Sequence, residues 1–197
     1  MVRTTIPDAV CPACDHRGLD YNAETIDLPY LGESLETMLR CSECGYRHVD
    51  FILTQTKDPM RHRLRVATEA DMMVRVVRSA SGTIRIPELG IDIEPGAASE
   101  AFITNVEGIL LRVDQVLGQL HRDADDDEMR ERVAALQRRI LELRLGQAEP
   151  VTLVLEDPFG NSAIIGEAAV AEPIPPAEAA ALKVGAFVFD QEEMEEE

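Results

Sequence analysis

Two stretches decide the fold of this chain: Cys11-Pro12-Ala13-Cys14 and Cys41-Ser42-Glu43-Cys44. They contain all four cysteines of the sequence. A Cys-x-x-Cys pair places two thiolates on one tight loop, and two such loops supply the four sulfur ligands of a tetrahedral zinc site. The spacing therefore predicts a zinc ribbon, in which Cys11, Cys14, Cys41 and Cys44 bind one structural zinc ion. Four sulfur ligands leave no open position for catalysis.

Two disulfides or a redox-active dithiol are the alternatives for these cysteines. Residues 1–10 lack the long apolar run of a signal peptide, so we expect a reducing cytoplasm, which disfavours disulfides. A redox dithiol needs one pair within a βαβ pattern, and neither pair has that context. His16 and His48 lie near the pairs, and we expect them to be surface residues rather than ligands.

The segment between the cysteine pairs is longer than the usual roughly 15 to 20 residues. We expect it to form a hairpin through Thr25-Ile26-Asp27-Leu28, with Pro29-Tyr30-Leu31-Gly32 at the turn. A strand over 46–53 should leave the ribbon, and Lys57-Asp58-Pro59 should break it. We therefore expect a ribbon domain at 1–57 and a larger domain at 58–197.

Charge is distributed unevenly over the 197 residues. Residues 1–90 hold 11 basic and 13 acidic side chains, whereas 91–197 hold 8 and 24, for a net charge of -18. Nucleic-acid affinity comes largely from neutralising phosphates, so the acidic half makes a nucleic-acid partner unfavourable. No stretch approaches the roughly 20 apolar residues of a membrane span, and we expect a soluble protein. The acidity fits a basic protein partner or plain solvation.

The second domain begins with a local basic cluster at Met60–Val66, which contains Arg61, His62, Arg63 and Arg65. Its partial alternation predicts a strand with one charged face. That face is either paired with nearby acidic residues or a docking surface for an acidic partner.

Short β-type runs follow at 72–77, 83–86 and 89–93, and β character returns at 151–156 and 163–165. β-Branched residues with period two and short turns favour an antiparallel sandwich or jelly roll. The linking segment Asp157-Pro158-Phe159-Gly160-Asn161-Ser162 has the composition of a turn. We expect 171–181 to be a linker or edge, 182–189 a final strand, and 190–197 an acidic, disordered tail.

Between these β regions the apolar period changes to three and four. One helical stripe consists of Ile103, Val106, Leu110, Val113, Leu117 and Leu120, and a second of Met129, Val133, Leu136, Ile140 and Leu143. Thr104 and Glu107 match a capping box, Asp125-Asp126-Asp127 should start the second helix, and Gly146 should end it. The pattern predicts an antiparallel helical hairpin at 104–146, joined by 121–124.

The motifs taken in order resemble those of the ZPR-type zinc finger proteins, in their short, single-module archaeal form. The resemblance covers residues 11–166. Besides the cysteine pairs, it rests on these segments: Val76-Val77-Arg78-Ser79, Ile86-Pro87-Glu88-Leu89, Thr104-Asn105-Val106-Glu107-Gly108 and Asp157-Pro158-Phe159-Gly160-Asn161-Ser162.

The resemblance implies a mainly β fold: a zinc ribbon like that of translation initiation factor two, then a double-stranded β-helix with an inserted helical hairpin. Eukaryotic relatives carry two such modules, bind translation elongation factor 1-alpha in its GDP form and assist its folding. This chain holds one module, so one suffices or the protein forms a homodimer. Leu31 stands where the family tends to have phenylalanine.

The leading hypothesis is a non-catalytic, zinc-dependent factor or chaperone for elongation factor 1-alpha. The expected partner contacts are Arg78, Ser79, Pro87, Glu88, Asp157, Pro158, Gly160, Asn161 and Ser162. The alternative is a nucleic-acid-binding ribbon in transcription or translation, against which stand the acidic charge and few aromatic residues. An enzyme is disfavoured because the four histidines are dispersed and no Gly-x-Ser-x-Gly or phosphate-binding motif is present.

Overall fold

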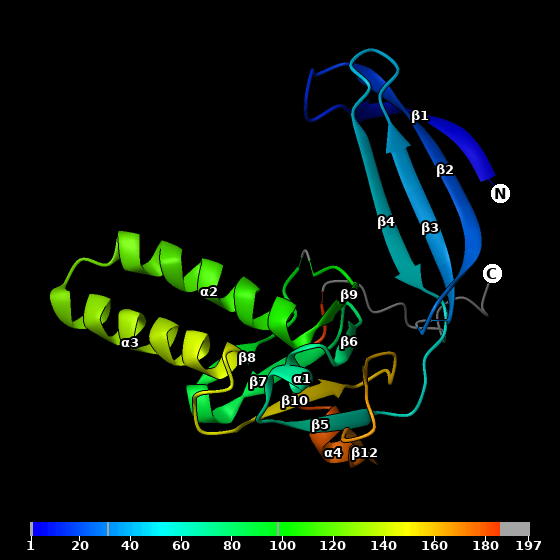
Figure 1. Ribbon diagram of the computed structural model, residues 1–197. Coiled ribbons are helices and arrows are strands. Elements are labelled where there is room, and N and C mark those ends of the chain that lie inside the picture. The colour runs from blue at the N-terminus through cyan, green and yellow to red at the C-terminus, as the bar shows by residue number, and fades with distance from the viewer. Residues whose placement is uncertain (1, 31, 98, 186–197) are drawn as a thin grey trace. The chain divides into compact units, whose positions relative to one another are not determined.

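The computed structural model describes residues 2–30, 32–97 and 99–185 and is shown in Figure 1. The chain forms two compact units, which divide between Lys57 and Asp58. Among the described residues, no helix has the length and apolar character that crossing a bilayer requires.

The first unit is a four-stranded antiparallel sheet with the order β1-β2-β3-β4. Its strands are β1 (Val2–Val10), β2 (Arg17–Leu28), β3 (Gly32–Arg40) and β4 (Arg47–Leu53). As predicted, β2 and β3 form a hairpin with Pro29 and Tyr30 in the turn, and Leu31 lies outside the described residues. Among the described residues of this unit, the buried hydrophobic cluster consists of Cys11, Leu19 and Cys41. So small a core cannot hold a sheet by itself.

The second unit contains a five-stranded sheet with the order β12-β5-β10-β7-β8 and a three-stranded sheet with the order β11-β6-β9. The strands of the larger sheet are β12 (Val170–Pro173), β5 (Met60–Val66), β10 (Val151–Asp157), β7 (Thr83–Ile86) and β8 (Ile91–Ile93). Those of the smaller sheet are β11 (Ala163–Ile165), β6 (Arg75–Arg78) and β9 (Phe102–Asn105). Every pairing between these described strands is antiparallel, as the predicted jelly-roll type of fold requires.

One hydrophobic core joins these two sheets and the helices. Its fully buried members include Leu64, Val76, Ile84, Ile109, Ile140 and Leu155. Burying such a side chain stabilises the folded state by roughly 1.5 to 3 kcal/mol. The alternation along β5, where Leu64 and Val66 are buried and Arg63 and Arg65 are exposed, places this core on one face of the larger sheet.

A helical hairpin extends from the strands of the second unit, and its two helices lie side by side in Figure 1. It consists of α2 (Val106–Asp123) and α3 (Asp127–Arg144). The predicted stripe is buried at Val106, Leu110, Val113 and Leu117 and at Val133, Ile140 and Leu143, whereas Leu136 is half-buried. Leu120 and Met129, near the tip, are exposed. At the C-terminus of α3, Gln147 N donates to Glu142 O at 2.8 Å and Gly146 N to Leu143 O at 3.0 Å. With φ of 65° at Gly146, these bonds form the expected glycine cap.

The start of the hairpin differs from the prediction. Thr104 belongs to β9, where it pairs with Val76, so it cannot cap the helix. The N-cap is Asn105, whose Oδ1 accepts from Gly108 N at 2.8 Å. Glu107 instead accepts from Arg144 Nη2 at 2.7 Å. Ile103 is likewise a strand residue, and the first helix runs through Asp123 rather than ending before 121.

Two predicted strands begin later than expected. Leu89 belongs to a short 3-10 helix, so β8 begins at Ile91. Met72 ends a short helix, α1 (Glu69–Met72), rather than beginning a strand. The carboxylate of Asp71 stabilises the start of this helix, because its Oδ2 accepts hydrogen bonds from the amides of Ala67 and Thr68 at 2.9 Å.

The segment after β11 also combines expected and unexpected structure. β12 is an edge strand, as predicted, but α4 (Pro176–Ala179) follows it. Residues 182–185 form no strand, and 186–189 and the tail at 190–197 lie outside the described part of the chain.

Candidate functional site

The four cysteines converge on one point of the ribbon. Cys11 Sγ lies 3.6 Å from Cys44 Sγ, and Cys14 Sγ lies 3.7 Å from Cys41 Sγ. All four sulfur atoms lie within 4.8 Å of one another. Sulfurs about 2.3 Å from a tetrahedral zinc ion would be about 3.8 Å apart. The four thiols therefore have the spacing of a metal site with four sulfur ligands.

The two cysteine loops are built alike. Asp15 N donates to Cys11 O at 3.0 Å, and Gly45 N donates to Cys41 O at 3.1 Å. Both loops then turn through a positive φ, 57° at Asp15 and 74° at Gly45, conformations that Gly and, less readily, Asp tolerate. The result is a pair of equivalent knuckles, each with one buried and one exposed cysteine.

Thiol ionisation is uneven across the site. Burial opposes ionisation of Cys11, but hydrogen bonds from the Ala13 and Cys14 amides and from Cys44 outweigh it and lower its pKa to about 7. The His16 amide lowers the pKa of Cys14, but the neighbouring sulfurs outweigh it and raise that pKa to about 12. Such a site binds a metal ion by releasing protons. Neither His16 nor His48 belongs to the cysteine group.

The predicted partner contacts divide by burial. Five are buried, namely Arg78, Ser79, Asp157, Asn161 and Ser162. Pro158 and Gly160 are half-buried, and Pro87 and Glu88 are exposed. The structure brings Arg78, Ser79 and the 157–162 turn together, whereas Pro87 and Glu88 lie in a separate short 3-10 helix, η1 (Pro87–Leu89).

Asp157 organises the buried group. Its carboxylate is fully buried and accepts hydroxyl hydrogen bonds from Ser79 at 2.7 Å, Ser81 at 2.8 Å and Ser162 at 2.6 Å. It also accepts from the amides of Phe159 and Asn161. These bonds fasten the 157–162 turn to the segment after β6. Ser81 is not among the residues predicted from the sequence, although its two-residue spacing from Ser79 could have indicated it.

Arg78 fixes the neighbouring loop. Its Nε donates to Gly82 O at 2.7 Å and its Nη2 to Ser99 Oγ at 3.0 Å. The guanidinium carbon also lies 5.5 Å from the ring centroid of Phe102, within cation–π range. Burial lowers the pKa of Arg78. The contacts of this side chain are therefore internal.

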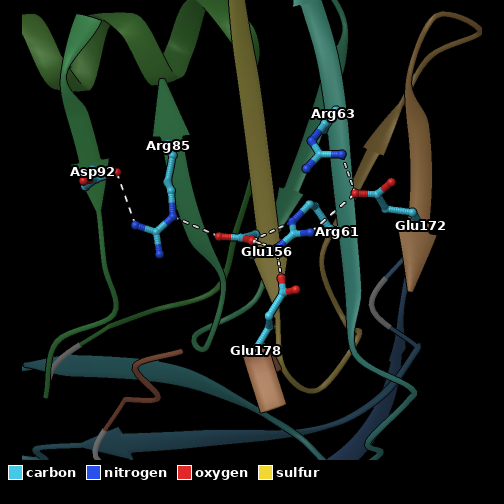
Figure 2. Close-up of polar contacts among 7 residues, drawn as sticks. All are labelled: Arg61, Arg63, Arg85, Asp92, Glu156, Glu172 and Glu178. Carbon is cyan, nitrogen blue, oxygen red and sulfur yellow. Dashed lines mark hydrogen bonds and ion pairs between the residues drawn. The ribbon is translucent and has the colours of Figure 1, made fainter. Parts of the chain in front are cut away.

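Two arginines of the basic cluster at Met60–Val66, Arg61 and Arg63, are paired with acidic residues, as Figure 2 shows. Arg61 lies 2.6 Å from Glu156 and 2.7 Å from Glu178, and Arg63 pairs with Glu172. Arg85 Nε donates to the other oxygen of Glu156 at 2.9 Å. The first interpretation of this cluster, a charged face paired with nearby acids, therefore fits the structure.

Glu156 gives a prediction for this network. Burial raises the pKa of its carboxyl, but hydrogen bonds from Arg85 and Arg61 outweigh burial and lower it below the ordinary 4.5. A lowered folded pKa means that the stabilisation is present above pH 4.5 and is lost as the pH falls through the lowered value. We expect Glu156→Gln to reduce the free energy of unfolding at pH 7 by about 1 to 3 kcal/mol. The difference should shrink below pH 4.5.

Urea unfolding followed by circular dichroism, at pH 7 and over an acidic series, measures this effect. The matched variant is Glu128→Gln, which removes the same charge from an exposed position on α3. A Glu156→Gln variant whose loss of stability stays constant across the series would contradict the linkage.

Comparison with known proteins assigns the chain to a family. Residues 70–185 match the model of the ZPR1 jelly-roll domain. The chain is 41% identical over 181 residues to a ZPR1-like protein of Methanocaldococcus jannaschii, which covers 91% of each protein. The chain belongs to the ZPR1 family. A ZPR1-like protein of Pyrococcus horikoshii is 38% identical over 90% of this chain and 81% of its own length.

The family extends to eukaryotes. The zinc finger chaperone zpr1 of Schizosaccharomyces pombe is 31% identical over 160 residues, 78% of this chain and 34% of that protein. The zinc finger protein ZPR1 of Bos taurus is 30% identical over 79% of this chain and 34% of its own length. The chain therefore spans about a third of these longer relatives, and their names place zinc and chaperone activity within the family.

Proposed function

We propose that this protein is a non-catalytic, zinc-dependent binding factor or chaperone for translation elongation factor 1-alpha, acting in the cytoplasm. One observation carries the proposal: most of the chain aligns with a fungal relative named as a zinc finger chaperone. The choice of elongation factor 1-alpha as the partner, and of its GDP-bound form, rests on the family resemblance of the sequence motifs.

The chemistry of the metal site supports a structural role for zinc. Four sulfur ligands suit zinc and fill its tetrahedral coordination, so no position is left for a substrate or an activated water. Among the described residues, the four cysteines are the one group of His, Cys, Asp or Glu with metal-binding geometry. The proposal therefore gives the metal the task of folding the ribbon.

Exposed residues on the second unit are the better candidates for direct partner contact. Pro87 and Glu88 present one surface, and Glu88 is positioned by hydrogen bonds from Thr152 N and Oγ1 at 3.0 and 2.8 Å. The half-buried Pro158 and Gly160 present a second, smaller surface, on the turn that Asp157 fastens. The buried residues of the predicted set would act by holding this turn in place.

A pull-down with elongation factor 1-alpha from the same organism tests the proposal. The immobilised, zinc-loaded chain is incubated with the factor in its GDP-bound and GTP-bound forms. We expect retention of the GDP form, with a Kd tighter than micromolar corresponding to more than about 8 kcal/mol of binding free energy. If neither the GDP-bound nor the GTP-bound form is retained, the proposal is wrong.

A matched pair of variants tests the contact surface. Glu88→Arg reverses an exposed charge beside Pro87, whereas Glu128→Arg reverses one on the exposed side of α3. If η1 contacts the partner, Glu88→Arg weakens retention and Glu128→Arg leaves it unchanged. If the two substitutions change retention of the partner equally, η1 is not part of the contact surface.

A further inference from the structure

Three arginines of the ribbon share one face of its sheet. The register pairs Thr5 with Asp20, Asp20 with Arg40, and Arg40 with Arg47 across the four strands. Arg3 lies two residues from Thr5 on the same strand. Because side chains alternate between faces along a strand, Arg3, Arg40 and Arg47 point to the same side. We call these three residues the arginine face.

The charges of the arginine face are not engaged in ion pairs within the described part of the chain. All three side chains are exposed, and the ion pairs found among the described residues include none of them. The nearest carboxylate by register, Asp20, accepts a hydrogen bond from Thr5 Oγ1 at 3.1 Å. Arg40 and Arg47 stand directly opposite each other on neighbouring strands, an arrangement that costs stability when both residues carry the same charge. An anion placed between them would relieve this repulsion.

The same face is hollowed. A depression of about 330 Å³ is lined by these residues: Arg3, Thr4, Thr5, Asp20, Tyr21, Asn22, Met38 and Arg40. Asn22 Oδ1 is buried and accepts no hydrogen bond from the described residues. Buried acceptors normally have a hydrogen-bond partner, so a bound chain that donates an N–H would supply the partner that Asn22 Oδ1 lacks. Two arginines and a free acceptor thus border one small depression.

We propose that the arginine face binds a short, extended, acidic peptide segment of a partner protein. Carboxylates of that segment lie between Arg40 and Arg47 and beside Arg3, and its backbone supplies the N–H for Asn22. A peptide fits better than a nucleic acid, because each non-proline residue of a peptide backbone carries an N–H that can donate to Asn22 Oδ1, whereas a sugar–phosphate backbone has no N–H. The inference builds on the proposed function only in requiring a protein partner, whatever its identity.

Fluorescence anisotropy with a fluorescein-labelled hexaglutamate peptide tests the proposal on the full, zinc-loaded chain. We expect binding that weakens as salt rises to about 0.15 M. The charge-reversed variant Arg3→Glu/Arg40→Glu/Arg47→Glu should lose at least about tenfold in affinity, since each pair is worth up to about a factor of five. A pull-down of elongation factor 1-alpha is a separate measurement, so the two proposals can fail independently.

The matched control is Arg122→Glu/Arg132→Glu/Arg138→Glu, which changes net charge equally at exposed positions of the helical hairpin. It should bind the peptide within about twofold of the wild type. Zinc content and the amide spectrum of the ribbon report whether the variants fold. If the reversed triple variant does not fold, Arg40→Gln/Arg47→Gln replaces it, because this change removes the repulsion between the two strands.

Three outcomes overturn the proposal. Equal loss in both triple variants would show a general charge effect. Tighter binding of a hexathymidylate oligonucleotide than of the peptide would assign the face to phosphate. Binding seen only after deletion of residues 190–197 would make the chain's own acidic tail the occupant.

Discussion

Replacing Cys41 with serine is expected to unfold the ribbon while leaving the second unit folded. The buried cluster of the ribbon contains little besides Cys11, Cys41 and Leu19, so we expect a bound metal ion to supply most of the folding free energy of the ribbon. Structural zinc contributes apparent values of about 10 to 16 kcal/mol in modules of this size. The core of the second unit contains neither cysteine, so its stability should not depend on the metal.

Elemental analysis and amide NMR spectra measure the two parts of this prediction. Wild-type protein should contain one zinc ion per chain, and Cys41→Ser should contain none. Amide resonances of residues 2–53 should move into the narrow chemical-shift range of unfolded chains, whereas those of the jelly-roll strands should stay dispersed. Strong chelator added to the wild type should reproduce this spectrum.

The control variant is Ser42→Ala, which alters an exposed residue of the same knuckle and keeps all four sulfurs. It should retain zinc and the folded spectrum. A ribbon that keeps its dispersed resonances in Cys41→Ser without metal would show that the sheet folds without the ion, and the structural role of zinc would then be wrong.

Replacing Asp157 with alanine is expected to produce the largest loss of stability within the second unit. The substitution leaves the hydroxyls of Ser79, Ser81 and Ser162 and two amides without their acceptor. Each buried donor left unsatisfied costs about 1 to 3 kcal/mol, and partial relaxation lets some find new partners. We expect a loss of about 3 to 5 kcal/mol in the free energy of unfolding.

Urea unfolding followed at the helical circular dichroism band reports on this unit, because its long helices are α2 and α3. Asp92→Ala is the comparison, because its exposed carboxylate lies on the edge strand β8 of the same sheet and pairs with Arg85 at 3.3 Å. An exposed pair of this kind is worth up to about 1 kcal/mol. Similar losses in the two variants would mean that the buried network contributes little beyond surface charge.

Much of the fold could be predicted because its signals are local. Four cysteines in two closely spaced pairs can bind one tetrahedral ion, so the two Cys-x-x-Cys motifs alone predicted the metal site. A change of apolar period at 106 located the hairpin, and Gly146 located its end. The helix cap was misplaced by one residue because Thr104 and Asn105 are both good caps, and only the pairing of Thr104 with Val76 in the sheet excludes the first.

The sequence by itself determined the four-cysteine metal site, the antiparallel β character and the helical hairpin, because each depends on spacing within a few tens of residues. Only the tertiary structure decided that Asp157 is buried against Ser79, which lies 78 residues away, and that Arg40 and Arg47 stand side by side. Such contacts depend on strand order and register. A shift of one residue in the pairing of a strand moves every side chain to the other face of the sheet. The local sequence pattern does not specify which register the strands adopt.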